Sequence, residues 1–170
     1  MSVGPRDAGD QGQHERAPRV ATLPAVTAAD EIRNLLGTYC ERMDLGDFDG
    51  IGDLFAHGRI ADEHGNPIAD GAAAVASFYR QGTQLHDGSP RTKHLVSNSV
   101  LDVDEPTGVA RVRSSYVVFQ QAGDLPLQAI IAGRYQDTFE RSGDRWRFTE
   151  RRFLVDLLGD LSRHLRYDVR

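Results

Sequence analysis

The second half of the chain changes from a helical to a strand-like hydrophobic period, and this change constrains the fold most strongly. Four long runs there are rich in β-branched and aromatic residues: TKHLVSNSVLDVD, GVARVRSSYVVFQQ, LQAIIAGRYQDTFER and DRWRFTERRFLVDLL. They are separated by EPTG, AGDLP and SGD, whose composition is typical of tight turns. The pattern predicts an antiparallel meander. Its strands, about a dozen residues each, must curve and carry β-bulges.

The first half has the period of amphipathic helices. Thr27 and Asp30 have capping-box spacing, and an apolar face follows at helical intervals, made of Ile32, Leu35, Leu36, Tyr39 and Met43. We expect a short second helix in DFDGIGDLF and a third in GAAAVASFYRQGTQL, with a short strand and a turn in GRIADEHGNPIAD between them. The element order predicts an α+β fold, a cone in which three N-terminal helices pack in a strongly curved antiparallel sheet around a hollow interior.

Length and charge narrow the function classes. The 170 residues suit one domain, expected over 27–170, after a Gly-, Pro- and charge-rich tail at 1–26 that is expected to be disordered. A net charge of −5 argues against nucleic acid as a partner. A single cysteine, Cys40, excludes an internal disulfide and a cysteine-rich metal site. Neither a membrane span nor a signal peptide is evident, so we expect a cytoplasmic protein without membrane contact.

A histidine near the start of the first long strand poses the functional question. Strand alternation places His94 on one face with Val96, Asn98 and Val100. His94 is either a packed residue with a satisfied hydrogen bond or an acid–base group aimed into the cavity. Asp44, at the end of the first helix, is open to the same choice, because aspartate is common where helices end.

Several segments together resemble the SnoaL-like branch of the nuclear transport factor 2-like superfamily. They are YCERMDLGDFDGIGDLFAHGRIADEHG, GAAAVASFY, TKHLVSN and GDRWRFTERRF, and the resemblance covers roughly residues 27–157. It implies a cone-shaped domain that pairs through its sheet into a homodimer or a higher homo-oligomer. The superfamily includes scytalone dehydratase, bile acid 7α-dehydratase and ketosteroid isomerase. It also includes the non-catalytic small subunit of ring-hydroxylating dioxygenases, so the fold alone does not settle the function.

The resemblance also implies a catalytic group. In the dehydratase-like members a tyrosine, an aspartate five residues later and a histidine early in the next long strand act together, and Tyr39, Asp44 and His94 match that pattern. A carboxylate orients an imidazole and fixes its tautomer, the imidazole moves a proton, and a phenol stabilises an enolate. We therefore expect a cofactor-independent dehydratase or isomerase for a mainly apolar, polyketide- or steroid-like ring substrate.

The expected substrate contacts are less specific. By resemblance Arg151 holds an anionic or carbonyl part of the substrate if a bulge turns it inward, whereas strict alternation turns Arg152 inward instead. An ion pair with Glu150, Asp156 or a dimer mate is the simpler interpretation of Arg151. The other candidates for the pocket wall are Asn98, Phe55, Phe78, Val96, Tyr116, Tyr135 and Trp146.

Two alternatives remain open. The segment around DEHG resembles that of ketosteroid isomerase, which makes Glu63 an alternative base, although an exposed turn is the simpler interpretation. The other alternative is a non-catalytic module for small-ligand binding or assembly. The loop histidines His57, His64 and His86 are a thin basis for a metal site, so none is expected.

Overall fold

The protein was analysed as a computed structural model that describes Met1, Gly4 and residues 26–167. The expected disordered tail, residues 1–26, lies outside the described residues except for Met1, Gly4 and Val26. Within the described part, no helix is both long enough and apolar enough to cross a membrane.

Three helices form where the apolar periodicity predicts them: α1 (Ala28–Leu45), α2 (Phe48–Leu54) and α3 (Gly71–Gly82). The capping box at the start of α1 is confirmed, because Thr27 and Asp30 satisfy each other's backbone N–H groups. The helix ends at Gly46, whose left-handed φ of 74° suits a residue without a Cβ. This stop leaves Asp44 in the last turn of α1.

The sheet has six strands in the order β2-β1-β6-β5-β4-β3. The strands are β1 (Arg59–Ala61), β2 (Pro67–Asp70), β3 (Thr92–Asp104), β4 (Val109–Ala122), β5 (Leu125–Ser142) and β6 (Arg145–Leu158). The predicted antiparallel meander is confirmed for β3 to β6. The sheet as a whole is mixed, because β1 runs parallel to β6. Prediction failed here because no tight hairpin joins these two strands, so turn chemistry does not reveal their direction. The segment between α2 and α3 also forms two short strands instead of one.

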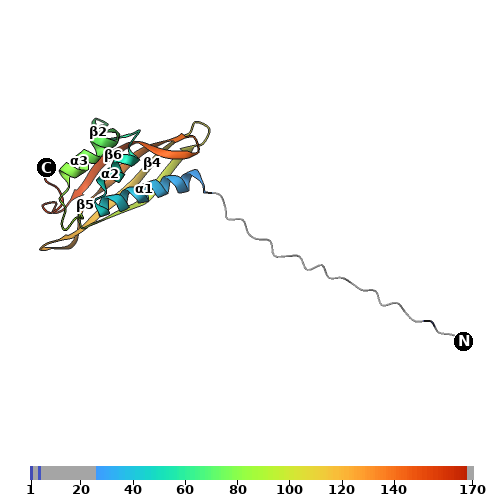
Figure 1. The fold of residues 1–170 in the computed structure, drawn as a ribbon, viewed down its shortest axis with the longest axis horizontal. Coiled ribbons are helices and arrows are strands. Elements are labelled where there is room, and N and C mark those ends of the chain that lie inside the picture. The colour runs from blue at the N-terminus through green and yellow to red at the C-terminus, as the bar shows by residue number, and fades with distance from the viewer. Residues whose placement is uncertain (2–3, 5–25, 168–170) are drawn as a thin grey trace.

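The helices cover one face of the curved sheet (Figure 1). The core lies between these layers and draws on every long element, with fully buried side chains that include Ile32, Ile51, Phe55, Val75, Ile130, Phe139 and Phe148. The sheet is an open, curved surface and not a closed barrel, with β2 and β3 at its edges. The helices therefore close the concave side of the cone.

Bulges decide which side chains face the interior. In β3 the register shifts between Ser97 and Val100, with Asn98 in the left-handed region at φ 51°. In β6 the register shifts after Phe148, and this turns Arg151 inward. The strand alternation expected from the sequence therefore holds only up to each bulge.

Gly133 in β5 permits a close approach of β6, which yields a testable stability prediction. A Cβ at Gly133 would lie 2.0 Å from the carbonyl oxygen of Leu154 and 2.9 Å from the hydroxyl of Tyr116. We expect Gly133→Ala to lower the free energy of unfolding by about 1–3 kcal/mol through overpacking. The matched control is Gly37→Ala on α1, where a Cβ meets no described atom within 4 Å and should stabilise by about 1 kcal/mol. Urea denaturation measures both, and equal effects would contradict the close packing.

Candidate active site

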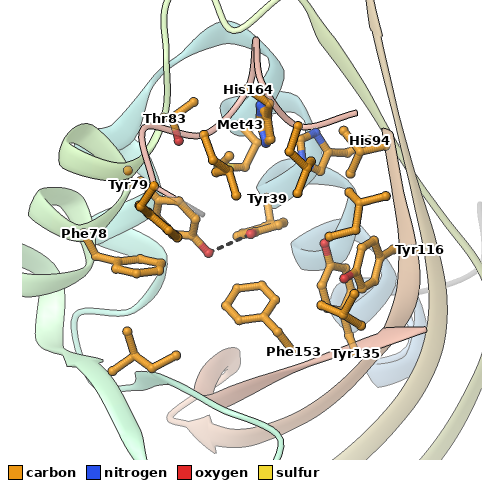
Figure 2. A pocket seen from close by; sticks show the side chains of 18 residues that line it. Tyr39, Met43, Phe78, Tyr79, Thr83, His94, Tyr116, Tyr135, Phe153 and His164 are labelled. Carbon is orange, nitrogen blue, oxygen red and sulfur yellow. Dashed lines mark hydrogen bonds between the residues drawn. The ribbon is translucent and has the colours of Figure 1, made fainter. Parts of the chain in front are cut away.

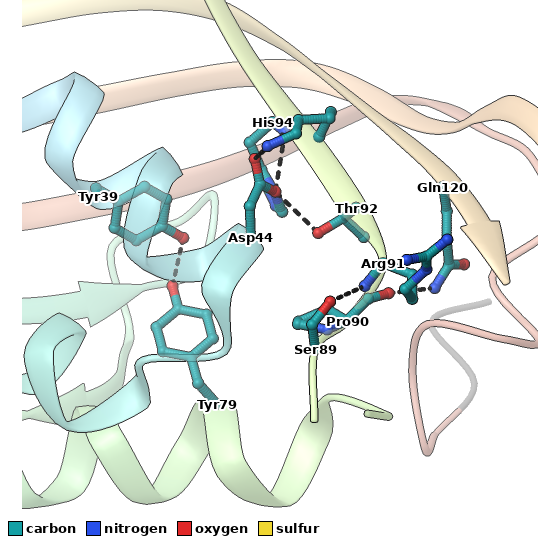
Figure 3. Close-up of polar contacts among 10 residues, drawn as sticks. Tyr39, Asp44, Tyr79, Ser89, Pro90, Arg91, Thr92, His94 and Gln120 are labelled. Atoms are coloured by element: carbon teal, nitrogen blue, oxygen red, sulfur yellow. Dashed lines mark hydrogen bonds and ion pairs between the residues drawn. The ribbon is translucent and has the colours of Figure 1, made fainter. Parts of the chain in front are cut away.

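Asp44 and His94 meet where the end of α1 packs against the start of β3 (Figure 3). The Nδ1 atom of His94 lies 2.7 Å from Oδ1 of Asp44, and both side chains are at least nine-tenths buried. The carboxylate also accepts from the backbone N–H of His94 at 3.1 Å and from the hydroxyl of Thr92 at 2.9 Å. A carboxylate can only accept, so the network assigns a proton to Nδ1. Nε2 is then the basic nitrogen of a neutral His94 ring.

The position of Asp44 would be unfavourable without these partners. A carboxylate in the last turn of a helix faces the negative end of the helix dipole, which costs about 0.3–1 kcal/mol. Burial alone raises the pKa of Asp44, but the hydrogen bonds and charge of His94, together with the Thr92 hydroxyl, lower it below its ordinary value. Asp44 therefore remains an anion beside the imidazole.

The lowered pKa of Asp44 predicts a pH dependence of stability. The unfolded chain binds a proton at Asp44 more readily than the folded chain, so its contribution is fully present above the unfolded value of about 3.9. The contribution is lost as the pH falls through the lower folded pKa. We expect the difference in unfolding free energy between the wild type and Asp44→Asn to shrink as the pH falls below about 4. Urea denaturation from pH 3 to 7 checks this, and a difference that stays constant would contradict it.

A cavity of about 390 Å³ lies beside this pair, between the helices and the sheet (Figure 2). Its walls are mainly aromatic and aliphatic, and the aromatic rings come from Tyr39, Phe78, Tyr79, Tyr116, Tyr135, Phe153 and Tyr167. The His94 and His164 rings lie near each other at one side of the cavity. A largely apolar pocket with a few convergent polar groups is typical of small-molecule sites.

Two tyrosines place a hydroxyl pair at the cavity. The hydroxyls of Tyr39 on α1 and Tyr79 on α3 lie 2.7 Å apart, and both side chains are buried. Burial raises the pKa of Tyr39, although Arg151 and the Tyr79 hydroxyl oppose the rise. Burial likewise raises the pKa of Tyr79. Both are neutral phenols near pH 7. One hydroxyl donates to the other within the pair, and the accepting hydroxyl keeps its own proton to donate to a ligand oxygen.

Arg151 lies one layer behind this tyrosine pair. Its fully buried guanidinium forms a bidentate pair with Asp137 at 2.7–2.8 Å and lies 4.1 Å from the ring centroids of both Tyr39 and Tyr135. Burial alone would lower the pKa of Arg151, but the Asp137 carboxylate raises it above its ordinary value, so the side chain remains a cation. The bulge in β6 turns Arg151 and not Arg152 inward, and Arg151 is not among the cavity-lining residues. The structure therefore favours an ion pair over the expected substrate contact.

Neither Glu150 nor Asp156, the two carboxylates suggested as partners of Arg151, pairs with it. Glu150 pairs with Arg59 and Arg152, and Asp156 pairs with Arg134. The alternation of Tyr135, Asp137 and Phe139 along β5 puts a carboxylate on the inward face, and this was the signal in the sequence for a buried cation.

The other predicted site residues divide into two groups. Phe78, Tyr116 and Tyr135 line the cavity. Phe55 and Trp146 instead pack in the core, Val96 is half-buried against it, Asn98 is exposed beyond the β3 bulge, and Glu63 lies in an exposed turn. None of these five residues lines the cavity.

The structure adds residues that the sequence did not single out. Phe153 and His164 line the cavity, and Tyr79 pairs with Tyr39 there. The spacing of Leu161, His164 and Leu165 put a histidine on the apolar side of the C-terminal segment, which was a usable signal. Within the described residues, no three His, Cys, Asp or Glu side chains cluster as metal ligands.

Comparisons with solved structures agree with this architecture. A protein from Novosphingobium aromaticivorans DSM 12444, provisionally described as a scytalone dehydratase, has 21% identity and a TM-score of 0.63, over 84% of this chain and 89% of that one. ActVI-ORFA from Streptomyces coelicolor has 17% identity and a TM-score of 0.60, over 75% of this chain and 96% of that one. A third structure is the beta subunit of a protein from Novosphingobium aromaticivorans DSM 12444 that is provisionally described as an aromatic-ring-hydroxylating dioxygenase. It has 22% identity and a TM-score of 0.59, over 76% of this chain and 89% of that one.

These likenesses, all below 25% identity, establish the fold alone. The family model of the SnoaL-like domain matches residues 24–152, which is most of the chain. The resemblance noted from the sequence segments is thereby confirmed, and the chain belongs to the SnoaL-like domain family.

Proposed function

We propose that the protein is a cofactor-independent acid–base enzyme that dehydrates or isomerises a mainly apolar ring compound in the cavity. One observation carries this proposal: the His94 ring lines an apolar cavity while its Nδ1 atom lies 2.7 Å from the Asp44 carboxylate. Burying the Asp44 carboxylate costs desolvation free energy, and its contact with Nδ1 leaves Nε2 of His94 as the basic nitrogen. An oriented imidazole at a ligand site is suited to proton transfer.

Dehydration of a β-hydroxyketone would use the residues as follows. Nε2 of His94 removes a proton from the carbon between the carbonyl and the hydroxyl-bearing carbon, and the C–H electron pair forms an enolate. Asp44 balances the charge that develops on the imidazole, and the Tyr39 hydroxyl donates a hydrogen bond to the enolate oxygen. The enolate then forms the new C=C bond, the C–O bond breaks, and the imidazolium proton leaves with the hydroxyl as water. Isomerisation would return the same proton to a different carbon.

The alternative in which Glu63 is the base fits the geometry less well. The Glu63 side chain is 60% exposed beside His64, and Glu63 does not line the cavity. A base for an apolar substrate must reach the proton that it removes. We therefore place the base at His94.

A non-catalytic module for ligand binding or assembly is the second candidate. The likeness to a dioxygenase beta subunit favours it, because that protein shares this fold. A binding module would need the cavity but not the Asp44–His94 contact. A variant of Asp44 or His94 that loses both ligand binding and turnover does not separate the two functions. A variant that loses turnover but still binds the ligand supports the enzyme.

The wild-type protein can be tested directly on two substrate types. One is a panel of fused-ring β-hydroxyketones, and the other is a set of β,γ-unsaturated ring ketones. Dehydration and isomerisation both produce a conjugated enone, whose ultraviolet absorbance reports turnover. We expect enone formation above the buffer rate with at least one member. Tight binding of the panel with no turnover of any member would favour the binding module.

A further inference from the structure

His164 is a buried histidine at the cavity with an unsatisfied nitrogen. It follows β6, is 6% exposed and lines the cavity beside His94. Its Nδ1 atom is buried and has no hydrogen-bond partner among the described residues. Leaving such a group unpaired costs about 1–3 kcal/mol, so a structural role alone does not account for it.

The segment that carries His164 is fixed on both sides. The backbone N–H of Gln84 donates to the His164 carbonyl at 2.8 Å, and that of Arg166 donates to the Gly82 carbonyl at 2.9 Å. The amide of Gln120 donates to the Arg163 carbonyl at 2.9 Å. The imidazole is therefore held at the cavity by its backbone, although the ring itself lacks a polar partner at Nδ1.

The environment keeps this second imidazole uncharged. Burial, with a smaller contribution from His94, lowers the pKa of His164 to about 4, although Asp44 opposes the shift. A neutral imidazole carries one N–H donor and one acceptor nitrogen. The two cavity histidines thus differ, because His94 has a carboxylate partner and His164 has none.

The spacing of the two rings suits a shared ligand atom. Their centroids are 6.4 Å apart. A hydrogen-bonded oxygen lies roughly 4 Å from an imidazole centroid, because the N···O distance is about 2.9 Å and the nitrogen lies about 1.2 Å from the centre. If one oxygen lies roughly 4 Å from each of the two centroids, the angle between the two centroid directions at that oxygen is about 105°. This angle is close to that between hydrogen bonds at a hydroxyl oxygen.

We propose that His164 is a second ligand-contacting residue: its ring N–H donates to a hydroxyl oxygen of the apolar ring ligand, and that hydroxyl donates to the bare Nε2 of His94. The ligand class is thereby narrowed to ring compounds with a hydroxyl group at the edge that faces the two histidines. The inference rests on the proposed function in one respect only, namely that this cavity is the ligand site.

A pair of probes isolates the oxygen. Isothermal titration of the full chain with 1-naphthol and with naphthalene compares two rings that differ by one hydroxyl group. We expect the wild type to prefer 1-naphthol, and His164→Leu to reduce that preference about tenfold, which corresponds to one hydrogen bond. His164→Gln, which keeps a neutral donor and acceptor, should restore part of the preference.

Labelled histidine provides a readout that does not depend on the variants. In ¹⁵N spectra of the wild type, 1-naphthol should shift the His164 ring nitrogens and naphthalene should not. An unchanged preference in His164→Leu, an absent preference in the wild type, or no binding of either probe would overturn the proposal. A retained preference without any enone turnover would instead count against the proposed function and leave the role of His164 intact.

Discussion

Arg151→Met is expected to lower the free energy of unfolding by about 3–5 kcal/mol, because it leaves a buried carboxylate without its counter-charge. The Asp137 and Arg151 side chains are both fully buried and are joined by two hydrogen bonds. Methionine roughly fills the volume but cannot neutralise Asp137. Chemical denaturation followed by circular dichroism measures the loss.

Two comparisons separate charge from packing. Arg134→Met removes a bidentate arginine pair of similar geometry whose side chains are 55% and 40% exposed, and it should change stability by less than about 1 kcal/mol. The double variant Arg151→Met with Asp137→Leu should regain much of the stability lost in the single variant. If the unfolding free energy of Arg151→Met falls by less than about 1 kcal/mol, the prediction that Asp137 needs the charge of Arg151 is contradicted.

His94→Gln and Asp44→Asn are expected to lower kcat for enone formation by about 10²–10⁴-fold, the range for loss of a general acid–base group. His94→Gln keeps hydrogen-bonding capacity but cannot carry the proton. Asp44→Asn keeps the shape of the side chain but removes the charge that balances the imidazolium. Stopped-flow or steady-state absorbance on whichever panel member the wild type turns over gives both values.

The control for this pair is Lys93→Gln. The Lys93 ammonium lies 3.7 Å from Oδ2 of Asp44 but is 77% exposed, so its removal should change kcat less than about threefold. Binding of naphthalene by Asp44→Asn should stay within about threefold of the wild type, because Asp44 is not one of the cavity-lining residues and naphthalene forms no hydrogen bond with His94. Full activity in both catalytic variants would reject the assigned roles.

Much of the fold could be predicted because local signals agree with tertiary packing. The Thr27 capping box and the turns between the long strands lie where the sequence indicates. The parallel pairing of β1 with β6 could not be predicted in this way, because it depends on how the intervening helices return the chain to the sheet.

The candidate site was predictable mainly where the family resemblance supplied a pattern of residues. Tyr39, Asp44 and His94 matched the pattern of the dehydratase-like members, and the structure brings Asp44 and His94, which are 50 residues apart in sequence, into contact. The β3 bulge at Asn98 reverses the side-chain alternation, so Asn98 lies apart from the cavity. His164 reaches the cavity from a segment beyond the last strand, and no periodicity within the strands reveals that contact.

The tautomer of His94 tests the central claim most directly, and it does not require the substrate to be known. Long-range ¹H–¹⁵N correlation spectra of histidine-labelled protein, recorded where the His94 ring is neutral, distinguish a protonated Nδ1 from a protonated Nε2. We predict a proton on Nδ1 and a bare Nε2 in the wild type, and a shift away from this form in Asp44→Asn. A wild-type ring that carries its proton on Nε2, with no response to Asp44→Asn, would contradict the assignment of His94 as a base held by Asp44.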